Sequence, residues 1–582
     1  MSTSVKRNNW LVLVVLFCST MISAQNISSP KQEVRAVWVT TVNSLDWPKP
    51  YDIGEQKSSL REIVIKLHAA HFNTIFFQVR GRGDALYQSS YEPWSDVLTG
   101  TLGKDPGWDP LQFIIEEAHA RAMEVHAWFN TFFVRSGKSR VTLTKPGHVA
   151  NENPDWVQNI EGQLWLDPGI PAVRSYLVKV GMDIIHKYDV DGIHFDFIRY
   201  PGTQFPDDKS YRAFGNGMQK DNWRRENINK FVRTFYDSAI AIKPMLKIGS
   251  APIGVYINTG SIRGLQGFSD LYQDSRRWLR EKIHDYVVPQ IYWSLGNQPA
   301  DPDFATVVKD WTEHTFGRHV YAGIGAYKPN VQQQLPELVD ISRSLGLQGN
   351  SFFRYENIVS KLDIGRRYQY PANIPAMSWK DRQQPNSPSN LSVKNIAKGI
   401  FRLNWNLPLP ANDGDVSKYY NVYRSTGKFI DVNNPSNLLA ILSSGETAYL
   451  DTITHAISPK YYYCISALDK GNNESLPTDG RSVIIPEIAA LAASFDLRNK
   501  LGNSYPEPTS SIAYFHYEIN TTLPVFLKIL NQSGEELVSV VDAVQTPGRY
   551  IAAADISKLQ GGTYTYMLIA GDFKEKRTLR IE

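Results

Sequence analysis

The stretch Val190–Pro201, VDGIHFDFIRYP, reads as a buried strand that runs into a charged and aromatic loop. Side chains alternate between the two faces of a strand, which places His194 and Asp196 together on one face. An aspartate inside an apolar run is costly to bury unless it has a partner or a task. In a parallel α/β barrel the carboxyl ends of the strands carry the catalytic groups, and Asp196 stands at such an end. The alternative is an aspartate that only caps the following loop.

Strands and helices alternate between Glu33 and about Asn357. Amphipathic helices, such as the one predicted around residues 60–67, separate several strand candidates. Eight strands with helical crossovers predict a (β/α)8 TIM barrel. A doubly wound open sheet is disfavoured because no glycine-rich phosphate loop follows the first strand. The predicted strands are Val34–Val42, Thr74–Arg80, Glu124–Phe132, Gly192–Phe197, Lys247–Ile253, Tyr286–Trp293, His319–Ala326 and Asn350–Tyr355.

The sequence changes in character near residue 380. Gln383–Asn390 is polar and contains proline, as linkers do, and the helical period disappears after it. Short strands separated by turn residues follow, and the inward Trp405 with three tyrosines at 461–463 resembles a fibronectin type III module. The expected domains are the barrel over residues 25–380, a fibronectin type III-like sandwich over 386–486 and a second small all-β sandwich over 487–582.

Composition indicates an ordinary globular chain of several domains. Of 582 residues, 42% are hydrophobic and 21% are charged, which suffices for several cores. The net charge of +4 gives no reason to expect a nucleic acid partner. Aromatic residues make up 12% of the chain, a content compatible with stacking on sugar rings. The sequence carries no signal for an oligomeric state.

Residues 1–24 have the features of a secretory signal peptide. Two basic residues precede the apolar run within Trp10–Met21, and cleavage is expected after Ala24. The bulky Phe17 before Cys18 disfavours a lipid anchor, which remains the alternative and the only expected link to a membrane. The mature chain then has one cysteine, Cys464, and no intramolecular disulfide. We therefore expect a protein secreted to the periplasm or the outer surface of a Gram-negative bacterium.

Polar and aromatic side chains gather near the predicted strand ends. Aromatic faces stack on the C–H surfaces of sugars, while amide and guanidinium groups bind hydroxyls. Each candidate also has a structural interpretation: the tryptophans can pack against helices, the histidine can be a satisfied core residue, and an arginine can pair with an interior acid. The predicted substrate-binding residues are Arg35, Trp38, Gln78, Arg80, Trp128, Asn130, His194, Arg199, Gln290, Tyr292 and Trp293.

Other chemistries find no motif in the sequence. The histidines are scattered, and neither His-Glu-x-x-His nor Cys-x-x-Cys occurs. His194 and Asp196 offer two ligands on one strand face, but no third ligand can be named. A Gly-x-Ser-x-Gly elbow is absent, which disfavours an esterase. We predict neither a metal nor a cofactor.

Several short blocks carry a resemblance to a known family. They are EVRAVWV (33–39), FNTIFFQVR (72–80), GDALY (83–87), GWDPL (107–111), LDPG (166–169), YDVDGIHFD (188–196), RYP (199–201) and PQIYW (289–293). Over roughly Glu33–Tyr355 the chain resembles the glycosyl hydrolase-like 10 family. The resemblance implies a TIM barrel associated with the bacterial envelope and, from at least one relative, action on peptidoglycan glycan strands. Many relatives have an acid or polar residue where this chain has Phe197, which leaves the second catalytic carboxylate open.

The sequence thus predicts a secreted glycoside hydrolase that acts on a bacterial polysaccharide. Such enzymes usually use two carboxyl groups. We expect Asp196 to be one of them, held ionised by Arg199, and its partner to be Glu356 or, second, Asp84, because both are predicted near strand ends. The alternative is a non-catalytic carbohydrate-binding or scaffold protein on a degenerate barrel, a reading that the missing second acid motivates.

Overall fold

The computed structural model describes residues 29–136, 146–296, 301–397, 399–453, 458–485 and 498–582. The predicted signal peptide and Cys18 lie outside these ranges. The chain divides into two compact units, of which the second contains the C-terminal sandwich. Among the described helices, none has the length and hydropathy needed to cross a membrane.

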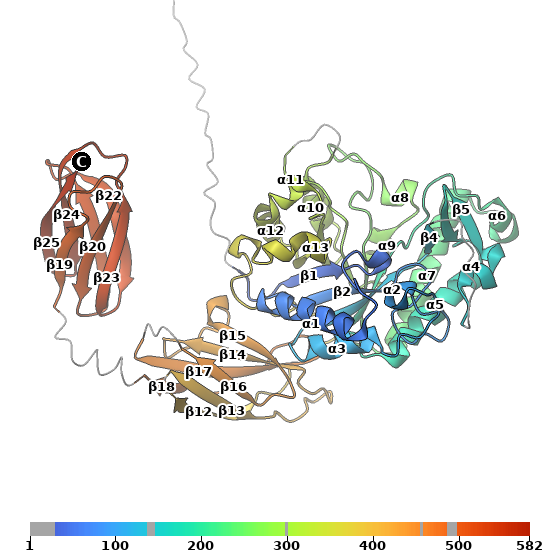
Figure 1. Cartoon of the computed structure of the whole chain (residues 1–582), viewed down its shortest axis with the longest axis horizontal. Helices are drawn as coiled ribbons and strands as arrows, with labels where there is room; N and C mark the ends of the chain where they lie inside the picture. The colour runs from blue at the N-terminus through green and yellow to red at the C-terminus, as the bar shows by residue number, and fades with distance from the viewer. Residues whose placement is uncertain (1–28, 137–145, 297–300, 398, 454–457, 486–497) are drawn as a thin grey trace, which may run out of the picture. The chain divides into compact units, whose positions relative to one another are not determined.

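Eight parallel strands close into a barrel, and their order around it follows their order in the chain. All eight predicted strands are present, so the predicted TIM barrel is confirmed (Figure 1). The strands are β1 (Val34–Val39), β2 (Thr74–Arg80), β3 (Glu124–Asn130), β7 (Gly192–Asp196), β8 (Lys247–Ser250), β9 (Tyr286–Val287), β10 (His319–Ile324) and β11 (Gly349–Phe352).

Helices surround the barrel because their apolar residues recur at helical spacing. In α1, Leu60, Val64 and Leu67 are buried, and in α3 the Asp109 side chain caps the first turn by accepting from Gln112 N–H. The longer helices are α1 (Ile53–Ala69), α3 (Pro110–His119), α5 (Pro171–Lys187), α7 (Lys220–Ile242), α10 (Phe304–Thr312) and α12 (Leu335–Ser344). The shorter ones are α2 (Asp96–Thr99), α4 (Val149–Glu152), α6 (Asp208–Phe214), α8 (Gly267–Asp270), α9 (Ser275–Arg280), α11 (Pro329–Gln332) and α13 (Tyr355–Ile358).

A small antiparallel sheet that we did not predict follows β3. It consists of β4 (Phe133–Ser136), β5 (Val157–Ile160) and β6 (Gln163–Leu166), in the order β4-β6-β5. Glu161 and Gly162 join β5 to β6 with φ of 50° and 84°. This is the backbone of a tight hairpin turn, which a two-residue connection ending in glycine signals in a sequence.

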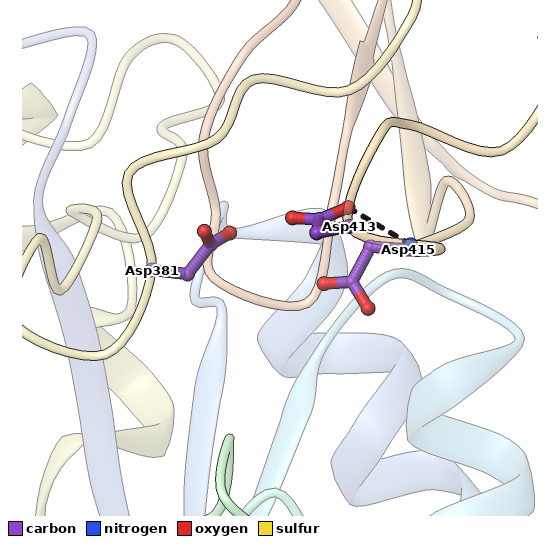
Figure 2. Close-up of side chains that lie close together, drawn as sticks. All are labelled: Asp381, Asp413 and Asp415. Carbon is purple, nitrogen blue, oxygen red and sulfur yellow. Dashed lines mark hydrogen bonds between the residues drawn. The ribbon is translucent and has the colours of Figure 1, made fainter.

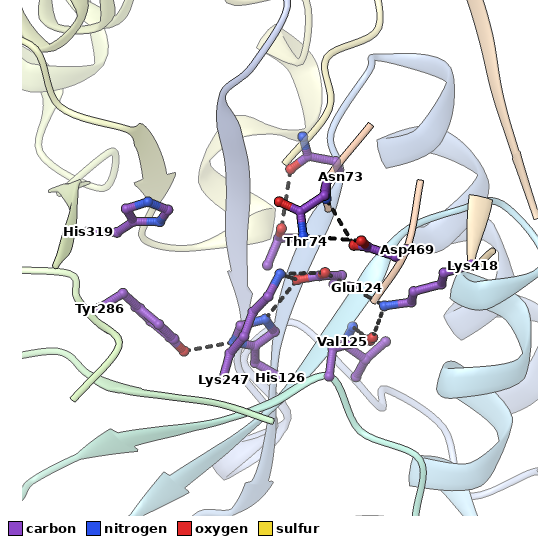
Figure 3. A network of polar contacts seen from close by, with 12 residues as sticks. Asn73, Thr74, Glu124, Val125, His126, Lys247, Tyr286, His319, Lys418 and Asp469 are labelled. Carbon is purple, nitrogen blue, oxygen red and sulfur yellow. Dashed lines mark hydrogen bonds and ion pairs between the residues drawn. The ribbon is translucent and has the colours of Figure 1, made fainter. Parts of the chain in front are cut away.

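The amino end of the barrel is filled by a buried ionic network (Figure 3). Lys247 Nζ lies 2.6 and 2.7 Å from the two carboxylate oxygens of Glu124. His126 contacts Glu124 at 3.2 Å through Nε2 and the Tyr286 hydroxyl at 2.7 Å through Nδ1. Burial alone would raise the pKa of Glu124, but Lys247 and Lys418 outweigh it and hold the carboxyl ionised.

Lys418 belongs to the middle β-module and enters this network from outside the barrel. Its Nζ lies 2.6 Å from Asp191 Oδ1 and 3.7 Å from Glu124 Oε1. Tyr419 and Leu468 of the same module share a small apolar cluster with Ala122. The barrel and most of the middle module therefore lie in one compact unit, although we expected a linker to separate them.

Both β-modules consist of a three-stranded and a four-stranded sheet. In the middle module the buried Trp405 packs edge-on against Tyr420, with ring centroids 5.5 Å apart. Its sheets are β12 (Ser389–Ala397), β13 (Ile400–Asn406) and β16 (Ala448–Thr452), and β15 (Leu438–Ser443), β14 (Tyr419–Ser425), β17 (Lys460–Leu468) and β18 (Arg481–Ile484). Those of the C-terminal module are β19 (Lys500–Tyr505), β20 (Ile512–Ile519) and β23 (Gly548–Asp555), and β22 (Glu536–Gln545), β21 (Leu523–Leu530), β24 (Gly562–Ala570) and β25 (Phe573–Ile581).

Candidate active site

Asp196 is the last residue of β7 and lies at the carboxyl end of the barrel. Its Oδ1 accepts a hydrogen bond from Phe197 N–H at 2.7 Å and one from Gln290 Nε2 at 3.3 Å. Burial raises the pKa of Asp196 to about 6, against the lowering effects of Phe197 N–H, Arg199 and Gln290. A carboxyl group with such a pKa can hold a proton close to neutral pH and give it to a substrate.

Arg199 stands beside this carboxyl group without forming an ion pair with it. Its guanidinium lies over the rings of Trp165, at 5.5 Å, and Phe197, at 5.2 Å, and donates to Tyr200 O at 3.2 Å. Among the described residues, no cationic nitrogen approaches Asp196 within 4.0 Å. We expected Arg199 to hold Asp196 ionised, but burial outweighs its charge and the pKa is raised instead.

Burial and then the charge of Asp196 raise the pKa of Tyr292, so these two side chains are neighbours, and further aromatic rings pack on Tyr292. Tyr292 stacks on Phe353 with centroids 5.6 Å apart, and Tyr327 meets Tyr292 edge-on at 5.9 Å. Gly325 permits this packing, since a Cβ there would lie 2.7 Å from Tyr292 Cβ. The predicted Gln290, Tyr292 and Asp196 are thus brought together, in a setting that suits a sugar ring.

Trp128 and Asn130 come from β3, and Asn130 pairs in register with Asp196 of β7. Trp128 is buried against Phe353, with ring centroids 6.3 Å apart, and its indole N–H lowers the pKa of Asp196 without full hydrogen-bond geometry. Asn130 Nδ2 donates to Gly81 O at 2.9 Å. Both side chains form the buried wall behind Asp196. Trp293, also predicted, is half-buried and packs against the apolar core around the barrel strands.

His194 and Trp38 lie inside the barrel, where hydrogen bonds within the core satisfy their ring nitrogens. Trp38 Nε1 donates to His194 Nε2 at 3.0 Å, and His194 Nδ1 lies 3.2 Å from the Tyr286 hydroxyl. Phe76 stacks on the His194 ring at 4.0 Å. Burial lowers the pKa of His194 well below its ordinary value, so it is a neutral core histidine, as its structural interpretation had it.

Gln78 and Arg80 of β2 hold the backbone around the strand ends. Gln78 Oε1 accepts from the N–H groups of Thr41, at 3.0 Å, and Val42, at 2.9 Å. The guanidinium of Arg80 is fully buried and pairs with both carboxylate oxygens of Glu92. These two predicted residues position loops of the site, and every nitrogen of the Arg80 guanidinium is engaged in doing so.

Arg35 is placed differently from what we expected. It is the second residue of β1 and so lies at the amino end of the barrel, away from Asp196. Its guanidinium donates to Glu33 at 2.8 Å, to Ser29 at 2.8 Å and to Tyr370 O at 2.6 Å. The position within the strand, rather than the residue type, decides this, and Arg35 does not reach the candidate site.

Neither predicted partner carboxylate contacts Asp196. Asp84 accepts from Ser95 at 2.7 Å and pairs with Arg82, and these contacts outweigh burial and lower its pKa. Glu356 is exposed on α13, where its backbone N–H donates to Asp46 Oδ1 at 2.9 Å. The structure therefore brings neither of these two acids into contact with Asp196.

The sequence analysis missed four aromatic residues of the site. Phe353 and Tyr327 pack on Tyr292, and the rings of Trp165 and Phe197 lie against the Arg199 guanidinium. Phe353 directly follows β11, and Tyr327 lies three residues after β10. The strand-end rule that selected Asp196 would also have found these two. Trp165 comes from the unpredicted β-sheet insertion.

One group of acids among the described residues has the spacing of metal ligands. Asp381, Asp413 and Asp415 bring carboxylate oxygens within 4.8 Å of one another (Figure 2). Burial, followed by the charges of Asp413 and Asp381, raises the pKa of Asp415. Asp413 and Asp415 belong to a loop of the middle module, so this cluster is separate from the candidate site at Asp196.

Comparison with known proteins identifies relatives of the barrel. The family model described as glycosyl hydrolase-like 10 matches residues 33–338. Glycosyl hydrolase YngK of Bacillus subtilis (strain 168) is 34% identical over 480 residues, which cover 76% of this chain and 92% of that protein. Glycosyl hydrolase DigH of Escherichia coli (strain K12) is 33% identical over 326 residues, which cover 51% of this chain and 74% of that protein.

Solved structures give a weaker likeness. The glycoside hydrolase domain of PgaB (BpsB) from Bordetella bronchiseptica aligns with 58% of this chain and 98% of its own length. Its TM-score is 0.42 and its sequence identity is 12%. A likeness of this size carries no argument about the site.

Proposed function

Since the chain belongs to the glycosyl hydrolase-like 10 family, we propose that it is a glycoside hydrolase whose proton donor is Asp196. The observation that carries the proposal is a buried, unpaired carboxyl group at the end of β7 with a pKa raised to about 6. Arg199, Gln290 and Tyr292 beside it offer the donors and the aromatic face that a hydroxyl-rich ring requires.

We further propose that the substrate is a bacterial polysaccharide, with peptidoglycan glycan strands as the first to test. The support is the resemblance of the barrel's sequence blocks to that family. Secretion through the predicted signal peptide, to the periplasm or the outer cell surface, is part of the same proposal. So is the fibronectin type III-like character of the middle module, which its seven strands and buried Trp405 support.

A second candidate function is carbohydrate binding without catalysis. It is favoured by one observation, that neither Glu356 nor Asp84 contacts Asp196. The two functions differ in whether reducing ends appear when the full chain is incubated with a glycan.

The test is Asp196→Asn on glycan strands freed of their peptides, with reducing-end release as the readout. Asparagine keeps the size of the side chain but cannot donate a carboxyl proton, so the rate should fall about 10²- to 10⁴-fold. Asp167→Asn is a matched control, since Asp167 is also buried with a pKa raised to about 6 but is bound by Ser210 and Gly169 N–H. It should retain activity. Full activity of a folded Asp196→Asn protein would refute the assignment.

A further inference from the structure

The other carboxylates close to the ends of the barrel strands are already bound. Each of three forms an ion pair with an arginine: Asp46 with Arg354, Asp84 with Arg82 and Glu92 with Arg80. Their oxygens also accept further hydrogen bonds, for example from Thr40 N–H to Asp46. A carboxylate that is held in this way is a poor nucleophile, because its lone pairs are occupied and its charge is neutralised.

The side chains next to Asp196, Arg199 and Tyr292, have pKa values that are influenced by Asp196 and by no other described carboxylate. Segments 137–145 and 297–300 contain no Asp or Glu, so every carboxylate of the barrel lies among the described residues. Asp196 is the one carboxylate that acts on the pKa of Arg199, and also on that of Tyr292. A retaining enzyme with its own nucleophile places two carboxyl groups about 5–5.5 Å apart. A carboxylate at that distance would strongly raise the pKa of Asp196, yet no described carboxyl group is among the main influences on that pKa.

Tyr292 is the open polar group next to Asp196. Its hydroxyl makes no hydrogen bond to a described residue, and its side chain is half-buried rather than enclosed. The ring is fixed by stacking on Phe353 and by the edge contact with Tyr327. A phenol held in this way can donate to a carbonyl oxygen of a bound substrate at little entropic cost.

We infer that the substrate itself supplies the nucleophile: the protein cleaves β-glycosides of 2-acetamido sugars, with Asp196 as the proton donor and the Tyr292 hydroxyl orienting the acetamido carbonyl. This inference rests on the proposed glycosidase function. Substrate-assisted catalysis is an established exception to the need for two protein carboxyl groups.

The steps balance without a cofactor. The acetamido oxygen attacks the anomeric carbon and forms a C–O bond, while the glycosidic C–O bond breaks and the Asp196 proton passes to the leaving oxygen. The intermediate formed by this first step is a cyclic oxazolinium ion. Water then attacks the same carbon, gives its proton to the Asp196 carboxylate and reopens the ring. Two displacements at one carbon leave its configuration unchanged.

The experiment follows the first-formed reducing ends by proton NMR, using the full chain and peptide-free glycan strands. The inference predicts β products, together with a loss of rate on the order of 100-fold or more on the same strands after de-N-acetylation. It also predicts that a thiazoline analogue of the oxazolinium ion, made from N-acetylglucosamine, binds and inhibits. Inverted products, or equal rates on the two substrates, overturn the inference but leave the glycosidase proposal standing. Cleavage of no glycan, with no binding of the thiazoline, overturns both.

Tyr292→Phe tests the positioning role. Removal of one hydroxyl should slow cleavage about 10- to 100-fold and weaken thiazoline binding, and it should slow cleavage of the de-N-acetylated strands by a smaller factor. Tyr505→Phe, on an exposed strand residue of the C-terminal module, is the matched control and should change neither. Equal slowing of Tyr292→Phe on both substrates would show that Tyr292 acts without the acetamido group.

Discussion

Buried carboxyl groups at the two ends of the barrel have opposite surroundings: Glu124 and Asp191 at the amino end are ion-paired, whereas Asp196 at the carboxyl end is not paired with any described residue. At the amino end, Glu124 and Asp191 lie beside Lys247 and Lys418, and each of these two carboxylates has a cation within ion-pair distance. At the carboxyl end, Asp196 is also buried but has no ion pair among the described residues. The first arrangement stabilises the fold and the second leaves a carboxyl group available for chemistry, which is the separation expected of a TIM barrel.

The opposite pKa shifts at the two ends give opposite pH dependences of stability. The pKa of Asp191 is lowered, since Lys418 and His119 outweigh burial, so its contribution is present above about pH 4 and is lost as the pH falls. The pKa of Asp196 is raised, so its contribution is present below about pH 4 and is lost as the pH rises through about 6.

Lys418→Met should have the largest effect on stability. It leaves Asp191 buried without its closest cation, and removal of one partner of a buried ion pair typically costs about 3–5 kcal/mol of unfolding free energy. Urea unfolding of the full chain, followed by far-UV circular dichroism, measures the change. Lys428→Met, on the same module outside this network, is the control. A loss below about 1 kcal/mol would show that the amino end does not depend on Lys418.

Asp196→Asn should act in the opposite direction. Burial raises the pKa of Asp196 from its ordinary value to about 6, so ionising this carboxyl group above pH 7 lowers the stability of the folded protein. Replacement by a neutral amide removes that cost and should raise the unfolding free energy by about 1–3 kcal/mol. The gain should disappear at pH 4, where Asp196 is protonated. A variant that is less stable than the wild type at both pH values would contradict the raised pKa.

Truncation tests how far the middle module belongs to the barrel. A barrel that ends near Gln384, within the linker-like segment, would lack Lys418 and the contact of Tyr419 and Leu468 with Ala122. The truncated barrel should therefore unfold at lower urea than a chain that ends after β18. Equal midpoints would show that the stability of the barrel does not depend on the middle module.

Arg199→Gln should give the smallest change. Loss of its positive charge removes one influence that lowers the pKa of Asp196, so the pH at which activity falls on the alkaline side should move upward, by about one unit or less. The direction is the test, since the kcat/KM profile should move toward higher pH. A downward move would mean that Asp196 is not the group that titrates.

The sequence was sufficient for the barrel and for the position of Asp196 at the carboxyl end of β7, because eight buried strands separated by amphipathic helices have few alternative folds. It was insufficient for residues whose role depends on their height in a strand or on distant partners. Arg35 and Asp196 are both polar residues of barrel strands, yet they lie at opposite ends of the barrel. His194 found its partners in Trp38 and Tyr286, which lie 156 and 92 positions away along the chain. Lys418 carried no local signal at all, since its acids belong to another module.

The most direct test of the account is the ionisation of Asp196 itself. Carbon NMR of protein with ¹³C-labelled aspartate carboxyl groups, compared between wild type and Asp196→Asn, assigns one resonance to this residue and follows it with pH. The account predicts a midpoint of about 6 for the resonance that the variant lacks. A midpoint below about 4, the ordinary range of an exposed aspartate, would contradict the claim that the barrel mouth keeps a proton on Asp196 for catalysis.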